Sequence, residues 1–372
     1  MNQCIFAEAF DLQMGKTPSR DEARFWDGSN IWVSIADMRD RKYINSSKEG
    51  ISDWAVKSTG IRVVPKGTVI MSFKLTIGKV CIATQDLYTN EAIMQFPIKP
   101  GYDILPEYLY YYLQGHKWKS TNNAVMGATL NKKKLSEEVI IYPSIEEQQR
   151  IVAELDLLSG IVEKKNAQLR TLDELASTIF YEMFGDPVSN EKHWPVKQLS
   201  SISTLLNGRA YKQDELLDKG KYKVLRVGNF FTNDNYYYSD LELEPEKYCD
   251  NGDLLFAWSA SFGAFIWSGP KVIYHYHIWK VLFDEKELNK LYYQYLLNAM
   301  TSSFMKDVHG IGMVHLTKGG MEQHLLPIPP REMQEQFAKM IEALERCKRT
   351  LSYSLAAAQE LLASRMDKYF NV

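Results

Sequence analysis

Pro143-Ser144-Ile145-Glu146-Glu147-Gln148 and Pro329-Pro330-Arg331-Glu332-Met333-Gln334 open two long helical stretches that lie 186 positions apart in the chain. The same shift places further identical residues on one another, namely Leu158 on Leu344, Leu169 on Leu355, Glu174 on Glu360, Leu175 on Leu361, and Phe184 on Phe370. Solenoid repeats recur every ~20 to 50 residues, which is far shorter. The period therefore predicts a duplicated unit of domain plus helix, so whatever one half does should be done twice in the chain, once by each half.

Both helical stretches carry a heptad seam of apolar residues, with Lys165 interrupting the first and Lys348 the second. The seam residues are Ile151, Leu155, Leu158, Val162, Leu169, Leu172, Ala176, Ile179 and Met183, and then Phe337, Ile341, Leu344, Leu351, Leu355, Ala358 and Leu362. Such a narrow seam needs a partner. Each helix could pack on its own domain. We favour an antiparallel coiled coil, because parallel helices would place both domains at one end. Helices of about 60 Å would then act as a ruler between the domains.

The globular halves, residues 1–142 and 185–328, repeat one another as well. Residues 67–78 align with 252–263, residues 108–113 with 291–296, and residues 130–132 with 316–318. Short β-branched and aromatic runs bounded by Gly, Pro or Asn predict strands in both halves. One tyrosine-rich helix is expected in each half, at 106–119 and 287–303. We expect α+β domains, each with a curved, barrel-like mixed sheet, followed by the helices 143–184 and 329–372.

Composition excludes several classes of protein. The chain has 372 residues, 45% of them hydrophobic and 12% aromatic, which is typical of folded domains. No apolar run reaches the ~18 residues that a membrane span needs, and the first residues make a poor secretory signal. The scattered cysteines Cys4, Cys81, Cys249 and Cys347 match neither a zinc site nor a disulfide framework. We therefore expect a cytoplasmic protein.

The charges are unevenly distributed, although the formal net charge is only −2. The first globular half is basic and the first long helix is acidic. Residues 108–136 contain no acid, and the equivalent residues 288–321 contain only Asp307, while both stretches carry several lysines. A basic stretch is often just a solvated surface, but its recurrence in both copies favours polyanion binding.

The residues give little sign of catalysis. The chain has no nucleotide-binding P-loop, no Asn/Asp-Pro-Pro-aromatic segment of the amino-methyltransferase kind, and no general base near Ser259 or Ser261. His275, His277, His309 and His315 could hold a metal, yet structural histidines are favoured because the first half has no equivalent set. We therefore expect no catalytic and no metal site, and no cofactor on this chain.

The remaining candidates are polar residues that could read DNA, since Arg, Lys, Asn and hydroxyl groups contact phosphates and base edges. In the first half they are Lys16, Arg20, Arg24, Arg39, Arg41, Lys42, Lys74, Thr76, Lys79, Asn122, Asn123 and Lys132. In the second half they are Arg209, Tyr211, Lys212, Arg226, Asn229, Ser259, Ser261 and Lys318. Two aligned pairs, Gly15-Lys16 with Gly208-Arg209 and Lys132 with Lys318, strengthen the set.

On these motifs the chain resembles the specificity subunit of Type I restriction–modification enzymes. The two Pro-x-x-Glu-x-Gln helix starts carry the resemblance, together with the Gly-Lys-Thr-Pro-Ser turn at 15–19, residues 32–37, the Gly-Asp-Leu-Leu segment at 252–255 and the duplicated order. It covers essentially the whole chain. One departure is that the turn at 15–19 follows a short N-terminal segment, which leaves little room for a first strand.

The resemblance implies two target recognition domains in a pseudo-two-fold arrangement, at 1–142 and 185–328, each reading half of a split sequence in double-stranded DNA. The spacer helices at 143–184 and 329–372 would set the gap and bind two modification subunits, and restriction subunits would join the complex. S-adenosylmethionine, ATP and Mg²⁺ would belong to those partners. Residues at the helix starts would serve the helix start or the partner subunits, namely Pro143, Glu146, Gln148, Pro329, Glu332 and Gln334.

Two other functions remain open from the residues alone. The chain could be a stand-alone DNA-modifying or DNA-cleaving enzyme with degenerate motifs. It could also be a protein–protein scaffold that does not contact DNA.

Overall fold

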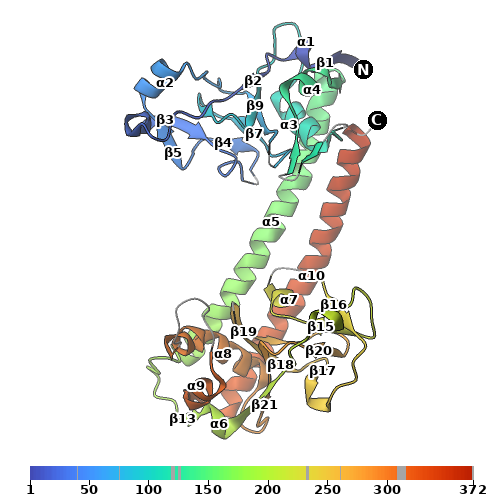
Figure 1. Ribbon diagram of the computed structural model, residues 1–372. Coiled ribbons are helices and arrows are strands. Elements are labelled where there is room, and N and C mark those ends of the chain that lie inside the picture. The colour runs from blue at the N-terminus through green and yellow to red at the C-terminus, as the bar shows by residue number, and fades with distance from the viewer. Residues whose placement is uncertain are drawn as a thin grey trace. The chain divides into compact units, whose positions relative to one another are not determined.

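A computed structural model describes the chain except residues 40, 75, 119–121, 125–126, 232–233, 260, 308–315 and 371–372, and it gives only the backbone of residues 122–124 and 127–129. The chain divides into two compact units (Figure 1). Unit 1 comprises residues 1–166 and 353–372, and unit 2 comprises residues 167–352. Each unit contains one globular half together with parts of both long helices, α5 (Ile145–Phe184) and α10 (Arg331–Phe370). None of the described helices has the length and apolar character to span a bilayer.

Strand pairing in unit 1 forms two main sheets in place of the single curved sheet that we expected. One has the order β2 (Gln13–Met14), β9 (Ile93–Phe96), β6 (Val69–Ser72), β7 (Val80–Ala83) and β4 (Tyr43–Ile44). The other has the order β5 (Glu49–Ile51), β3 (Trp26–Val33) and β8 (Tyr88–Thr89). Both sheets mix parallel and antiparallel pairs. The central strands β6, β7 and β9 of the first sheet are buried on both faces.

Unit 2 repeats this plan with two four-stranded sheets. The first has the order β14 (Ser203–Asn207), β21 (Ile278–Phe283), β18 (Leu254–Ser259) and β19 (Ser261–Ile266). The second has the order β16 (Tyr237–Ser239), β15 (Tyr222–Leu225), β20 (Val272–Tyr274) and β17 (Tyr248–Cys249). The β18–β19 hairpin corresponds to β6–β7, which agrees with the alignment of 252–263 on 67–78.

A short strand opens each globular half and pairs with the strand that precedes a long helix. In unit 1, β1 (Asn2–Ile5) runs antiparallel to β12 (Val139–Tyr142). In unit 2, β13 (Val196–Gln198) runs antiparallel to β22 (Leu325–Pro327). The short N-terminal segment therefore does hold a first strand equivalent to that of the second half.

The tyrosine-rich helices are α3 (Pro106–Gly115) and α8 (Lys290–Phe304), both shorter than the stretches expected. The hydroxyl of Tyr108 donates to the Ile141 carbonyl at 3.0 Å, and that of Tyr292 donates to the Pro327 carbonyl at 2.8 Å. Tyr108 thus corresponds to Tyr292, whereas the sequence alignment had set it against Leu291. The alignment was wrong by one residue, because both segments are so rich in Tyr and Leu that neighbouring registers match almost equally well.

A buried glutamine fastens the start of each long helix to the segment before the tyrosine-rich helix. Gln148 Nε2 donates to the carbonyls of Asp103 and Pro143 at 2.8 and 3.0 Å, and its Oε1 accepts the Leu105 N–H at 2.8 Å. Gln334 repeats these bonds in unit 2, with Nε2 donating to Glu287 and Pro329 at 3.0 and 2.9 Å and Oε1 accepting Asn289 N–H at 2.8 Å. Neither side chain is exposed.

Within each unit the start of one long helix packs beside the end of the other, so the pairing is antiparallel as expected. In unit 1, Glu154 of α5 pairs with Arg365 of α10 at 2.9 Å, and Phe370 packs on Tyr108 with ring centroids 5.5 Å apart. In unit 2, Phe180 of α5 contacts Phe337 of α10 at 5.7 Å. The helix ends also enter the domain cores, so the helices pack both on each other and on the domains.

The heptad seam is confirmed along both helices, since every residue assigned to it is buried or half-buried. The two lysines that interrupt the seam have polar partners. Lys165 donates to Ser354 Oγ at 2.7 Å, and Lys348 contacts Asp173 and Glu345 at 2.7 and 2.9 Å. Gly185 ends α5 with a φ of 75°, a left-handed conformation that favours glycine.

Candidate nucleic-acid interface

A glycine turn crosses the end of an equivalent strand in both units. Lys16 N–H donates to the Thr89 carbonyl at 2.8 Å, and Arg209 N–H donates to the Tyr274 carbonyl at 3.0 Å. A Cβ on Gly15 would lie 2.0 Å from the Thr89 oxygen, and one on Gly208 would lie 2.3 Å from the Tyr274 oxygen. Only glycine fits this approach, so the aligned pair Gly15-Lys16 and Gly208-Arg209 is one structural feature present twice.

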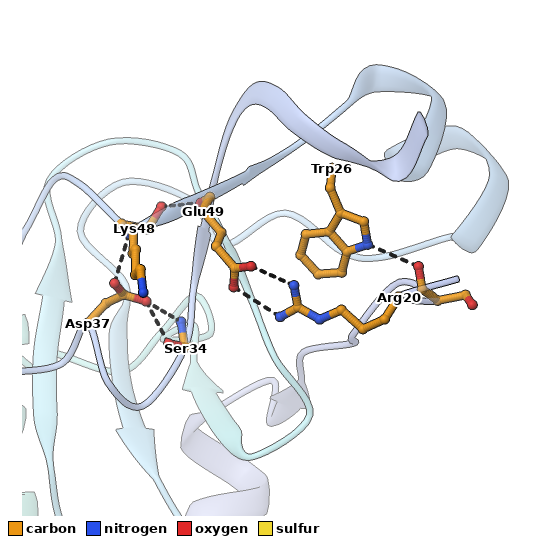
Figure 2. Close-up of polar contacts among 8 residues, drawn as sticks. Arg20, Trp26, Ser34, Asp37, Lys48 and Glu49 are labelled. Atoms are coloured by element: carbon orange, nitrogen blue, oxygen red, sulfur yellow. Dashed lines mark hydrogen bonds and ion pairs between the residues drawn. The ribbon is translucent and has the colours of Figure 1, made fainter. Parts of the chain in front are cut away.

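A second turn is also repeated, immediately after the parallel strand pairs β3–β8 and β15–β20. Asp37 Oδ2 accepts the Ser34 N–H at 2.8 Å and the Ser34 hydroxyl at 2.7 Å, while Asp37 Oδ1 accepts the Lys48 N–H at 2.9 Å (Figure 2). In unit 2, Asn229 Oδ1 accepts the Arg226 N–H at 2.9 Å. Because parallel strands end at the same edge, each unit brings its glycine turn and its Asp/Asn turn to one edge.

The arginines that follow the first glycine turn are neutralised by carboxylates. Figure 2 shows Arg20 reaching Glu49, with guanidinium–carboxylate distances of 2.5 and 3.0 Å, and the guanidinium lies 3.7 Å from the centroid of Trp26. This bidentate pair holds the pKa of Glu49 below its ordinary value. Arg24 pairs with Glu22 at 3.0 Å, and Lys16 donates to the Thr59 carbonyl at 2.6 Å.

Unit 2 also has an arginine–glutamate pair beside its glycine turn, formed by the counterpart of Lys16. Arg209 binds Glu215 at 2.8 and 2.7 Å, and this contact lowers the pKa of Glu215 to about 2. Tyr211 stacks against His275 with ring centroids 6.4 Å apart, and burial raises the pKa of Tyr211. Lys212 is exposed. Arg226 differs from Arg209, since among the described residues it contacts no carboxylate and instead lies 5.2 Å from the centroid of Tyr237.

Two adjoining hollows in unit 2 gather several of the candidates. A hollow of about 600 Å³ is lined by Arg226, Asn229 and Ser259 together with His275 and His277. A second hollow, of about 480 Å³, is lined by His277 and Lys318 among others. Arg226, Asn229 and Ser259 therefore share a hollow with both histidines, which we expected to be structural, while Lys318 shares the second hollow with His277 alone.

Other candidates lie apart from these edges. Lys42 is held by Asp156 of α5 and lies 4.8 Å from the ring of Tyr111, with its side chain only 14% exposed. Such a residue stabilises the join between domain and helix and has little surface for DNA, which argues against the contact that we expected. Arg41 donates to the Asp37 carbonyl at 2.8 Å, and Arg39 is exposed.

The hairpin turns and short helices hold the remaining candidates. Lys74, Thr76 and Lys79 lie at the β6–β7 turn, and Ser261 opens β19 after the equivalent turn of unit 2. Lys132 and Lys318 are exposed first residues of the equivalent helices α4 (Lys132–Glu137) and α9 (Lys318–Gln323), which Asn131 and Thr317 cap. The side chains of Asn122 and Asn123, on β10 (Asn122–Ala124), lie outside the described residues.

The helix-start residues divide into buried and exposed sets. Gln148, Gln334 and Pro329 are buried and Pro143 is half-buried, while Glu146 and Glu332 are exposed. The buried glutamines therefore serve the helix start and leave no surface for a partner subunit. Among these helix-start residues, Glu146 and Glu332 are the pair that is exposed in both units.

The described residues contain no group of His, Cys, Asp and Glu that could hold a metal ion. His309 and His315, which we had considered with His275 and His277, lie outside those residues. Burial, with His277 and Arg226 nearby, lowers the pKa of His275 to about 4, so its ring is neutral at physiological pH.

The model of the Type I restriction modification DNA specificity domain matches the chain twice, over residues 6–171 and 191–356. The chain belongs to this family. Its relatives include the Type I restriction enzyme MjaIX specificity subunit of Methanocaldococcus jannaschii, which is 27% identical over 373 residues covering 89% of this chain and 83% of the relative. The EcoR124I/EcoR124II specificity subunit of Escherichia coli is 28% identical over 158 residues, 38% of this chain and 37% of the relative.

Two solved structures share the fold over nearly the whole chain. One, from a study of complex assembly and conformational transition of the type I R-M system, superposes with a TM-score of 0.62 at 16% identity and covers 99% of this chain and 97% of its own. The crystal structure of a Type-I restriction-modification system S subunit from M. genitalium gives a TM-score of 0.56 at 13% identity, covering 99% and 95%. At these identities the likeness concerns the fold alone.

Proposed function

We propose that the chain is the specificity subunit of a Type I restriction–modification enzyme and that it reads a bipartite sequence in double-stranded DNA. The repeated pair of turns at the strand edge of each unit is the observation that supports this most directly. Both copies combine a cation beside a close glycine turn with a polar turn after β3 or β15. The two units thus share the backbone of these turns but carry different polar side chains on it, which suits the reading of different bases.

The contacts within the site divide the candidates into two roles. Exposed cations such as Lys132, Lys212 and Lys318 suit phosphates, which need charge but no exact orientation. Arg20 and Arg209 are already bound to glutamates and stacked on or near aromatic rings, so they hold the loops in shape. We therefore propose that the paired arginines position the readout loops and that the exposed lysines contact the backbone of DNA.

The proposal assigns catalysis to other chains. Two modification subunits would bind the duplicated helices and supply S-adenosylmethionine and methyl transfer, and restriction subunits would supply ATP- and Mg²⁺-dependent cleavage. The complex would work in the cytoplasm, where its DNA lies. This chain would bind none of these cofactors.

The test is to prepare the chain with and without its modification subunits and to measure methylation of genomic DNA with S-adenosylmethionine. The expected result is methylation only by the assembled enzyme, at a motif with two specified halves separated by a fixed gap. Product formed by the chain alone, in the presence of S-adenosylmethionine, Mg²⁺ and ATP, would make it a stand-alone enzyme. An assembly that shifts no duplex DNA would make it a scaffold.

A further inference from the structure

The hollow of about 600 Å³ in unit 2 is lined by residues whose counterparts in unit 1 differ in chemistry. Arg226 stands in unit 2 where Ser34 stands in unit 1, since both N–H groups are accepted by the turn residue three positions later. His275 stands where unit 1 has Asn90, since His275 N–H donates to Leu225 at 2.9 Å and Asn90 N–H donates to Val33 at 3.1 Å. The backbone is thus shared, whereas the side chains that line the edge are not.

Arg226 is placed by its neighbours but keeps its guanidinium available. Asn229 accepts the Arg226 N–H and donates from Nδ2 to the Asn235 carbonyl at 2.9 Å, which ties the turn to the segment that carries Tyr236 and Tyr237. The guanidinium lies 5.2 Å from the centroid of Tyr237. Unlike Arg20 and Arg209, it has no carboxylate partner among the described residues. A planar guanidinium stacked on an aromatic ring is oriented for bidentate hydrogen bonding.

His275 presents a second donor to the same hollow. Its Nδ1 accepts the His277 N–H at 3.4 Å, which assigns the proton of the neutral ring to Nε2. The centroid of its ring lies 6.4 Å from that of Tyr211 and 4.8 Å from that of His277, and these ring contacts restrict its rotation. Asp218 lines the hollow as well and adds an acceptor.

We infer that this hollow reads one G·C base pair of the second half-site, with Arg226 donating to O6 and N7 of guanine and His275 adding a donor beside it. In the major groove guanine presents two acceptors next to the amino group of cytosine, and arginine is the usual bidentate partner of guanine. Asp218 matches the cytosine amino group. Asn229 is a positioning residue that acts through Arg226. The inference rests on the proposed function and adds to it the residues and the base that one domain recognises.

The experiment uses the assembled methyltransferase on a DNA library with both half-sites randomised. Arg226→Lys keeps the charge but loses the planar pair of donors. We expect preference for guanine at one position of the second half-site to fall about 5- to 150-fold, the range for one bidentate contact, while the first half-site and the gap stay unchanged. His275→Phe keeps a ring but removes the donor, and we expect a smaller loss at the same position.

Lys286→Gln is the matched control, because Lys286 is an exposed cation of the same unit outside the hollow. It should leave the motif as in the wild type. Binding of Arg226→Lys to non-specific duplex, with an unchanged salt dependence, verifies that the variant is folded. A strict wild-type motif with Arg226→Lys would overturn the inference, as would an altered first half-site. A wild-type enzyme without a bipartite motif would instead overturn the proposed function.

Discussion

At the scale of single residues, the buried glutamines make the clearest prediction. Replacing Gln148 by Ala removes three hydrogen bonds and leaves the Asp103 and Pro143 carbonyls and the half-buried Leu105 N–H without this partner. Such groups cost about 1–3 kcal/mol when orphaned, so we expect unit 1 to lose about 2–4 kcal/mol of stability. Hydrogen exchange at the Leu105 amide should accelerate accordingly.

The exposed neighbour provides the control for this substitution. Gln149→Ala should leave exchange at Leu105 unchanged, and Gln334→Ala should repeat the effect at Asn289 in unit 2, with exposed Gln336→Ala as its control. Equal exchange in Gln148→Ala and Gln149→Ala would contradict the role assigned to the buried amide.

The Arg209–Glu215 pair predicts a pH dependence of stability. The folded pKa of Glu215 is lowered to about 2 from an ordinary value of 4.5, first by Arg209 and then by the Lys212 N–H. Its contribution is therefore complete above the ordinary value and is lost as the pH falls from about 4.5 toward 2. Thermal unfolding of Glu215→Gln should vary less with pH in that window than the wild type, whereas exposed Glu244→Gln should follow the wild type.

Individual site residues were predictable only where the repeat identified them. Gly15 with Gly208 and Lys132 with Lys318 occupy equivalent places, as the alignment indicated. The partners that decide what a cation can do were not visible, because Glu49 and Asp156 reach Arg20 and Lys42 from other elements. We expected His275 to be structural because the first half has no equivalent histidine. A site that reads different bases in each half, however, should differ between the two copies.

At the scale of elements, the repeated identities on the long helices separate into two groups. Leu169 and Leu355 are half-buried, and Phe184 and Phe370 are buried, so packing explains them. Leu175 and Leu361 are 42% and 44% exposed, each beside an exposed glutamate, and packing within the chain does not account for them. Two equivalent exposed surfaces suit two copies of one partner.

Leu175→Asp should therefore halve partner binding without unfolding the chain. We expect the number of modification subunits per chain to fall from two to one by native mass spectrometry, with stability changed by no more than about 0.5 kcal/mol because the site is on the surface. Leu157→Asp is the control, since Leu157 is 66% exposed on the same helix but has no leucine at the equivalent position. Two bound subunits in Leu175→Asp would refute the assignment.

The helices were predicted more fully than the sheets. A heptad seam depends on local spacing, and the residues it named are those that the structure buries. Division of the strands into two sheets depends on long-range pairing, such as β3 with β8 and β15 with β20, which alternation along one strand does not specify. The alignment of the two tyrosine-rich helices was wrong by one residue, because their composition fits several alignments.

At the scale of the whole molecule, the duplication was the most reliable inference, and the two family matches repeat it in the same order. That the two long helices set the gap between the half-sites is still a prediction. Helix pairing within unit 1 sets Glu154 opposite Arg365 and Lys165 opposite Ser354, so Val162 lies opposite Ala357. Insertions at these two positions would lengthen both helices together.

Inserting seven residues after Val162 and seven after Ala357 keeps the seam on the same face, because a heptad is its repeat. Each helix grows by about 10 Å at 1.5 Å per residue, which equals roughly three base pairs at 3.4 Å each. We expect methylation mapping to show both half-sites unchanged and the gap about three base pairs longer. Seven residues inserted after Gly101, in an exposed loop, should leave the gap as it was. An unchanged gap with the lengthened helices would mean that the domains, and not the helices, set the distance between the bases that are read.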